Sequence, residues 1–167
     1  VALNEVKKTA GGKGLNVSRV LRQAGIDVCA TGIVGGTTGQ LIINQCSDIG
    51  IDTQFEEIEA ESRNCIAILH DGNQTEILES GAAVSPAVQA TFLKRFDQLL
   101  EKVDVVAISG SVLPGFSTDL YAQMVERVGV QGKKVILDTS GSQFVTALNH
   151  HVKPFAIKPN SSELSEL

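Results

Sequence analysis

The chain contains, at residues 103–140, the sequence VDVVAISGSVLPGFSTDLYAQMVERVGVQGKKVILDTS. It opens with an apolar run at 103–109 that is typical of a buried strand, and a second such run follows at 134–137. Between the two runs, apolar residues recur at the spacing of one helix face: Leu120, Tyr121, Met124, Val125 and Val128. A strand, a helix and a strand in this order form a parallel crossover unit. We therefore expect an α/β fold with a mainly parallel sheet.

The same alternation of strands and helices extends through most of the chain. Further core strands are expected at 28–34 and 155–157. Helices are expected over Gly14–Ala24, over Thr37–Ile49 and near Ser142–Leu148. Thr37 and Gln40 have the spacing of a capping box. Two more helices are expected to begin at Ser85-Pro86 and after Ser117, which would act as a cap. Function should then lie at the carboxyl ends of the strands, which is where open parallel sheets bind ligands.

Residues 54–79 break this alternation. Three short strand-like runs, at 54–59, 64–70 and 74–79, follow one another, and Asp71-Gly72-Asn73 is a strong hairpin signal. We expect a small antiparallel sheet inserted between the α/β units. The run at 65–69, CIAIL, is apolar on both faces, so the sheet must cover another part of the structure or pair with a second chain.

Composition narrows the functional classes. With 167 residues and 43% hydrophobic residues, the chain can bury a core as one compact unit. A net charge of −5 without a basic stripe argues against nucleic-acid binding. Cys29, Cys46 and Cys65 form no CxxC pair, so we expect buried thiols in a reducing cytoplasm. No apolar run reaches the length of a membrane span, so no membrane partner is expected.

The most informative motif is Ala10–Asn16, AGGKGLN. It is not a Walker P-loop, because Lys7 stands in place of the first glycine and Gly14 in place of the Ser/Thr. A dinucleotide fingerprint is also disfavoured, since its third glycine is missing. Glycines before a helix let a ligand approach the helix's first amide groups, Lys13 adds a point charge suited to phosphate, and Asn16 can bond hydroxyls. The alternative is a glycine-rich turn with a solvated lysine.

Other candidate residues also have two interpretations. Asn160 and Glu163 have the spacing of a capping box, or Glu163 serves a Mg²⁺–phosphate group with Asn160 and Lys158 on the same rim. Arg63 is either a solvated edge charge or a phosphate clamp. Asp138 is either a helix cap or a metal ligand. The three histidines, His70, His150 and His151, have no partners at metal-ligand spacing and are expected in turns or on the surface.

Taken together, three motifs resemble the phosphofructokinase-B branch of the ribokinase-like sugar kinases: AGGKGLN at 10–16, SGS at 109–111 and KPNSSE at 158–163. Residues 63–79 are most similar to tagatose-6-phosphate kinases, with 1-phosphofructokinases as near relatives. The resemblance spans essentially the whole chain. It implies a ribokinase-like three-layer α/β/α sandwich with a small antiparallel lid, whose strands lie around 1–10 and 52–80.

The resemblance also implies a role for each candidate residue. Sugar hydroxyls would be held by Gly11, Gly12 and Asn16, the substrate's phosphate by Lys13 and Arg63, and Ser111 would flank the sugar. Lys158, Asn160 and Glu163 would serve ATP, and Glu163 and Asp138 would serve Mg²⁺. The implied reaction is ATP-dependent phosphorylation of tagatose 6-phosphate to the 1,6-bisphosphate, in lactose and galactose catabolism, by a cytoplasmic phosphotransferase that dimerises through its lid. A 1-phosphofructokinase and a non-catalytic sugar-phosphate-binding fragment are the alternatives.

Three departures from the family pattern matter. The segment 109–115, SGSVLPG, carries an extra Val112, and residues 79–82 lack the family's proline. The family's upstream substrate-binding aspartate and its downstream GAGD segment are absent. We therefore expect the general-base aspartate beyond Leu167, together with the rest of the ATP site, and expect the 167-residue chain alone to be inactive.

Overall fold

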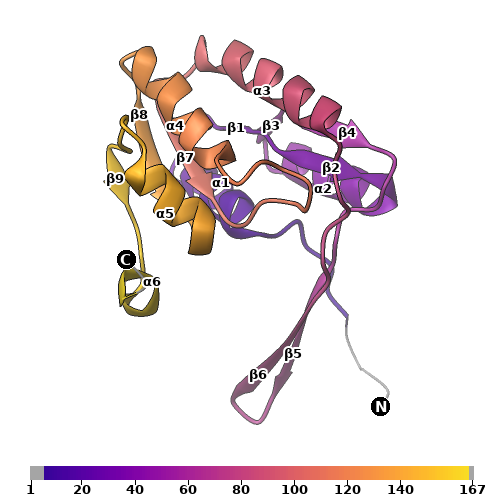
Figure 1. Cartoon of the computed structure of the whole chain (residues 1–167). Helices are drawn as coiled ribbons and strands as arrows, with labels where there is room; N and C mark the ends of the chain where they lie inside the picture. Colours follow the sequence, from indigo (N-terminus) through magenta and orange to yellow (C-terminus); the bar gives the residue numbers. More distant parts are fainter. Residues whose placement is uncertain (1–5, 166–167) are drawn as a thin grey trace. The chain divides into compact units, whose positions relative to one another are not determined.

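The computed structural model describes residues 6–165 and divides into two compact units, Val1–Asn64 and Cys65–Leu167 (Figure 1). Helices and strands alternate in both units, and all strand pairs except one are parallel. The predicted α/β class with a mainly parallel sheet is confirmed. No helix among residues 6–165 is long and apolar enough to cross a membrane.

Unit 1 begins with helix α1 (Lys13–Gln23), within one residue of its predicted position. Gly25, with φ at +81°, follows the helix, and its amide donates to the Arg22 carbonyl at 3.0 Å. Glycine adopts this left-handed conformation without a steric penalty, and it ends the helix as predicted.

The single strand predicted at 28–34 is two short strands, β1 (Cys29–Ala30) and β2 (Ile33–Gly35). Each pairs in parallel with a strand from beyond helix α2, β1 with β3 (Asp52–Thr53) and β2 with β4 (Glu56–Ile58). Between them, the Thr31 hydroxyl donates to the Gln54 carbonyl at 2.7 Å.

The run at 54–59 was wrongly predicted to belong to the antiparallel insertion. It contains β4, which is parallel to β2 because helix α2 (Gly36–Asp48) carries the chain back between the two strands. No strand is present at residues 6–10, and the rest of the lid strand expected around 1–10 lies outside the described residues.

The antiparallel pair is the hairpin of β5 (Cys65–His70) and β6 (Asn73–Leu78), drawn as a long two-stranded ribbon in Figure 1. Asp71 and Gly72 both have positive φ, 48° and 75°, as a type I′ turn requires, so the hairpin prediction is confirmed. All twelve residues of the two strands are exposed. Cys65 is among them and Cys29 is half-buried, so the expectation of buried thiols holds only for Cys46.

The rest of unit 2 is a three-stranded parallel sheet with its connecting helices. The order is β7-β8-β9, from β7 (Val105–Ser109), β8 (Lys134–Asp138) and β9 (Ala156–Ile157). The helices are α3 (Pro86–Leu100), α4 (Leu120–Val130), α5 (Gly141–Asn149) and α6 (Ser161–Ser165). Helix α4 packs on both β8 and α5, and its apolar face is buried as predicted.

The observed caps of helices α3 and α4 agree with those predicted from the sequence in the first case and differ in the second. Ser85 accepts from the Val88 amide at 3.3 Å, and Pro86 takes the first helical position of α3. Ser117 was predicted to cap α4, but the capping residue is Asp119. The Ser117 hydroxyl instead donates to the Asp119 carboxylate.

Candidate functional site

The predicted sugar-binding motif forms the N-terminal end of α1. Gly12 is the residue before the helix, with φ at +103°, and as a glycine it supplies no side-chain cap to the first turn. A residue other than glycine would be strained in this conformation. Lys13 and Asn16 are both exposed at the start of the helix. The motif therefore offers backbone amides, a cation and an amide side chain at one helix end, the donor set that suits a phosphorylated sugar.

Two residues that the sequence did not single out hold this motif in place. Gln45 of α2 accepts from the Ala10 amide at 2.5 Å and donates to the Lys8 carbonyl at 3.1 Å. Arg19 donates to the Ala10 carbonyl and, at 3.1 Å, to the Asn16 side-chain oxygen. The segment that leads to Gly11 and Gly12 is thus fixed from two helices, which preorganises the glycines for a ligand.

The N-terminus of α2 is closed by a carboxylate of the protein itself. Glu61 accepts from the amides of Thr37 and Thr38 at 2.8 and 3.0 Å, and these bonds lower its pKa because they stabilise the charged form. The capping box predicted between Thr37 and Gln40 is therefore wrong. The cap comes from a residue 24 positions away, which local spacing cannot show.

The same loop carries Arg63, the predicted phosphate clamp. Ser62 accepts from the Gly35 amide at 3.0 Å, and its own amide donates to the Gly35 carbonyl at 2.8 Å. A side chain at Gly35 would lie 2.1 Å from the Ala60 carbonyl oxygen, so only glycine permits this close approach. Arg63 follows directly and is exposed, in the same unit as Lys13.

In unit 2 the predicted residues lie at the carboxyl ends of three neighbouring strands. Ser109 at the end of β7 is in register with Asp138 at the end of β8. The Gly110 amide then donates to the Asp138 carbonyl at 2.9 Å. The carbonyl oxygen of Gly110 accepts hydrogen bonds from the Tyr121 hydroxyl at 3.2 Å and from the Thr139 hydroxyl at 2.8 Å. These bonds fix the loop that presents Ser111, which is exposed.

Asp138 and Lys158 form an ion pair across this edge. Lys158 Nζ lies 3.5 Å from Asp138 Oδ2, with the lysine side chain 72% exposed and the aspartate side chain 10% exposed. The Lys158 amide also donates to the Leu137 carbonyl at 3.0 Å, which continues the pairing of β9 with β8. The N-cap position of α5 is Ser140, so Asp138 does not occupy it.

Asn160 and Glu163 form the predicted capping box. The Asn160 amide donates to Glu163 Oε2 at 2.8 Å, and the Glu163 amide donates to the Asn160 side-chain oxygen at 2.9 Å. This structural interpretation is confirmed, and it does not conflict with a ligand role. The carboxylates of Asp138 and Glu163 supply oxygen donors, which Mg²⁺ prefers, and Lys158 supplies a cation for phosphate. The residues present therefore fit a Mg²⁺–nucleotide group.

A wide hollow of unit 2 lies away from these strand ends. An open groove of about 620 Å³ runs between α3 and the loop before α4, with the Arg127–Asp97 ion pair at 2.5 Å in its wall. It is a wide, helix-lined hollow, whereas parallel sheets bind ligands at the carboxyl ends of their strands. We therefore place the candidate site at the strand ends and not in this groove.

The histidine prediction needs a correction. His150 and His151 were expected to have no partner at metal-ligand spacing, yet both face the Glu126 carboxylate, at 3.8 and 3.3 Å. Glu126 belongs to another helix, so sequence spacing could not indicate the contact. His70 meets the expectation of a surface position: it lies on the exposed hairpin, 3.2 Å from the Thr75 hydroxyl.

Comparison with known proteins identifies the fold and the family. A possible 1-phosphofructokinase from Thermotoga maritima is 31% identical with a TM-score of 0.90, and the match covers 96% of this chain and 52% of that protein. Phosphofructokinase-2 from Escherichia coli, in complex with potassium, is 26% identical with a TM-score of 0.81, covering 93% and 50%. Ribokinase from Giardia lamblia, 18% identical with a TM-score of 0.72 over 93% and 49%, shares the fold.

The chain thus spans about half the length of the solved structures it matches, and its fold is the ribokinase-like α/β fold. The family model of the pfkB family carbohydrate kinases matches residues 1–167. Because that match extends over the whole sequence, the chain belongs to the pfkB family of carbohydrate kinases.

Proposed function

We propose that the enzyme containing this chain transfers the γ-phosphoryl group of ATP to a ketohexose phosphate. The observation that supports this most is the family match over all 167 residues, together with the glycine-bordered, lysine-bearing end of α1. The favoured substrate is tagatose 6-phosphate, which would become the 1,6-bisphosphate. The resemblance of residues 63–79 to tagatose-6-phosphate kinases supports that choice.

The second candidate is 1-phosphofructokinase activity on fructose 1-phosphate. A specific observation favours it: the protein described as a possible 1-phosphofructokinase matches this chain at a TM-score of 0.90. Both substrates are ketohexose phosphates that require a cation for the phosphate and donors for the hydroxyls. Lys13 and Arg63 are our candidates for the phosphate, and Gly11, Gly12 and Asn16 for the hydroxyls.

The residues of unit 2 would serve the nucleotide side. Lys158 would hold phosphate oxygens, with Asn160 beside it, and Asp138 and Glu163 would hold Mg²⁺ through their oxygens. When bound, Mg²⁺ neutralises charge that develops on the phosphoryl oxygens. Ser111, on the loop fixed at Gly110, would flank the sugar. The general-base aspartate, which takes the proton of the attacking hydroxyl, is expected beyond Leu167, so the 167-residue chain alone is expected to be inactive.

The hairpin would act as a lid and as a dimer contact. Its exposed apolar residues lie on both faces: Ile66, Ile68 and Ile77 on one, and Leu69 and Leu78 on the other. A lid needs one apolar face to exclude water from the site, and the face of Leu69 and Leu78 would serve in this way. The face of Ile66, Ile68 and Ile77 would pair with another copy.

The substrate choice is tested with the full-length enzyme and an assay that couples ADP release to NADH oxidation. We expect kcat/KM to be highest for tagatose 6-phosphate; a higher value for fructose 1-phosphate selects the second candidate, and no turnover of either sugar contradicts both. Lys13→Met and Arg63→Met should each lower kcat/KM for the sugar phosphate by about 10- to 100-fold, since each removes a charge-assisted bond to phosphate. The KM for ATP should change little.

Lys102→Met is the matched control. Lys102 is exposed just after α3 and lies outside the proposed site, so its loss should leave kcat/KM unchanged. If Lys102→Met lowers kcat/KM as much as Lys13→Met does, the effect is general electrostatics and the phosphate assignment is wrong.

A further inference from the structure

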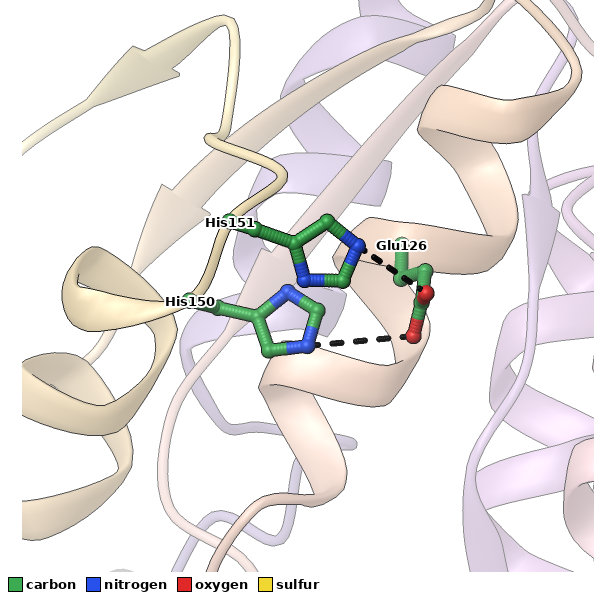
Figure 2. A group of neighbouring side chains, drawn as sticks. All are labelled: Glu126, His150 and His151. Carbon is green, nitrogen blue, oxygen red and sulfur yellow. Dashed lines mark ion pairs between the residues drawn. The ribbon is translucent and has the colours of Figure 1, made fainter.

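Three side chains of unit 2 converge at one point on its surface (Figure 2). His150 Nε2 lies 3.8 Å from Glu126 Oε2, and His151 Nε2 lies 3.3 Å from Glu126 Oε1. The two imidazole rings lie side by side, with centroids 4.2 Å apart. All three ligand atoms lie within 4.8 Å of one another.

The backbone under these side chains is held by the core. Glu126 stands on α4 between Val125 and Val128, which are 1% and 0% exposed. His150 is the residue after α5, with extended backbone at φ −65° and ψ 155°, where the chain turns out of the helix. Since α4 and α5 pack against each other, the two elements that carry the ligands are fixed relative to one another.

The ligand atoms are close enough to gather around one ion. Zn²⁺ binds nitrogen and oxygen ligands at about 2.0–2.2 Å, which in a tetrahedron puts the ligand atoms about 3.3–3.5 Å apart. Here one ligand atom from each residue lies within 4.8 Å of the other two, and each imidazole faces a different oxygen of the Glu126 carboxylate, at 3.3 Å for His151 and 3.8 Å for His150. The side chains must therefore close in by about an ångström to share one ion. The side chains of His151, Glu126 and His150 are 71%, 40% and 25% exposed, so they can adjust and a water can complete the shell.

We propose that Glu126, His150 and His151 form a binding site for one Zn²⁺ ion, distinct from the Mg²⁺ of phosphoryl transfer. Two imidazoles and one carboxylate suit Zn²⁺ and its neighbours in the first transition row. Mg²⁺ prefers oxygen ligands alone and is not expected here.

The position of the cluster indicates a structural role. Helix α5 starts beyond Asp138, at the carboxyl edge of the sheet, and nine helical residues carry the chain about 13–14 Å before His150. The ion would therefore lie at the far end of α5 from Asp138, where it joins α5 to α4.

Binding would break one weak contact. The Val152 amide donates to His150 Nδ1 at 3.4 Å, and ligation through Nε2 moves the neutral ring's proton to Nδ1. A bond of this length is near the limit of hydrogen bonding, so its loss costs little. The neighbouring cation does not compete for the site, because Lys153 donates to the Leu148 carbonyl.

The test is isothermal titration of the full chain with Zn²⁺ alone, in a Cys65→Ser background that removes the exposed thiol. We expect one ion per chain. His151→Ala and Glu126→Gln should each weaken binding by about tenfold or more, since each removes one of three ligands, and excess Mg²⁺ should not compete. His70→Ala, which removes an exposed histidine of the hairpin, should leave the affinity unchanged.

Co²⁺ gives an independent readout. Its visible spectrum should show tetrahedral ligand-field bands without thiolate charge transfer, and these bands should be lost in His151→Ala. Circular dichroism checks that each variant is folded. We expect folded variants because the His151 side chain is 71% exposed and because Gln has the same size as Glu at position 126. No Zn²⁺ binding to the parent chain, or equal affinity in the parent and both ligand variants, overturns the proposal and leaves an ordinary ion pair.

Discussion

Tyr121 provides a direct test of how the loop at the end of β7 is held. Its side chain is 7% exposed, and its hydroxyl donates to the Gly110 carbonyl at 3.2 Å. If the hydroxyl loses its proton, a negative oxygen faces a carbonyl oxygen in a buried site. Burial accordingly raises the pKa of Tyr121 to about 12. We expect alkaline pH to destabilise unit 2 at this point and to release the loop that carries Ser111.

The size and pH range of the effect follow from the two pKa values. In the unfolded chain the phenol titrates near pH 10, so below that pH it is neutral in both states and its full contribution is present. As the pH rises from about 10 to about 12, the unfolded state alone gains charge and the free energy of unfolding falls. The loss is about 1.4 kcal/mol at pH 11 and about 2 to 3 kcal/mol above pH 12.

The chain has one tyrosine and no tryptophan, so the ultraviolet absorbance of phenolate reports on Tyr121 alone. Urea unfolding at about pH 8 and about pH 11, followed by circular dichroism, gives the change in free energy of unfolding. Lysines also titrate in this range, and Tyr121→Phe subtracts their effect. The reasoning is refuted if the phenol titrates near pH 10 without unfolding, or if Tyr121→Phe loses as much stability as the parent chain.

Two further predictions concern unit 1 and the hairpin. Glu61→Gln should speed hydrogen exchange at the Thr37 and Thr38 amides, measured by nuclear magnetic resonance. The pKa of Glu61 is lowered in the folded chain, so in the parent chain the two amides should be protected from exchange above about pH 4.3. This protection should be lost as the pH falls through the folded pKa. Exchange that Glu61→Gln leaves unchanged would mean that Glu61 is not the cap. The complete enzyme should sediment as a dimer that Ile68→Lys dissociates and Gln74→Lys does not, and a monomeric parent would contradict the dimer contact.

The α/β alternation could be predicted because its signals are local. The strands at 105–109 and 134–138 and the helix between them each carry their own apolar periodicity, and all three lie within two residues of the expected bounds. The direction of pairing is different. Nothing within the short run at 56–58 indicates a parallel partner, because that partner, β2, is separated from it by the whole of α2.

The same distinction between local and distant contacts applies to the candidate site. Asn160 and Glu163 are three residues apart, and their reciprocal bonds were readable from spacing alone. Gln45 lies 35 residues from the Ala10 amide it holds, and Glu126 lies 24 residues from His150. Such contacts depend on helix packing, and a single sequence carries no signal for them.

The two helices of unit 1 offer a comparison that bears on substrate binding. The N-cap residue of both helices is a glycine, which has no side chain to accept from the first amides. Both helices therefore present backbone amide groups at their positive end. In α2 the Glu61 carboxylate accepts hydrogen bonds from the Thr37 and Thr38 amides. In α1 the first turn contains no acid and carries Lys13, while Gln45 and Arg19 fix the approach to Gly12 from outside. An anion that enters unit 1 therefore meets a protein carboxylate at α2 but a lysine at α1, and the substrate's phosphate is expected at α1.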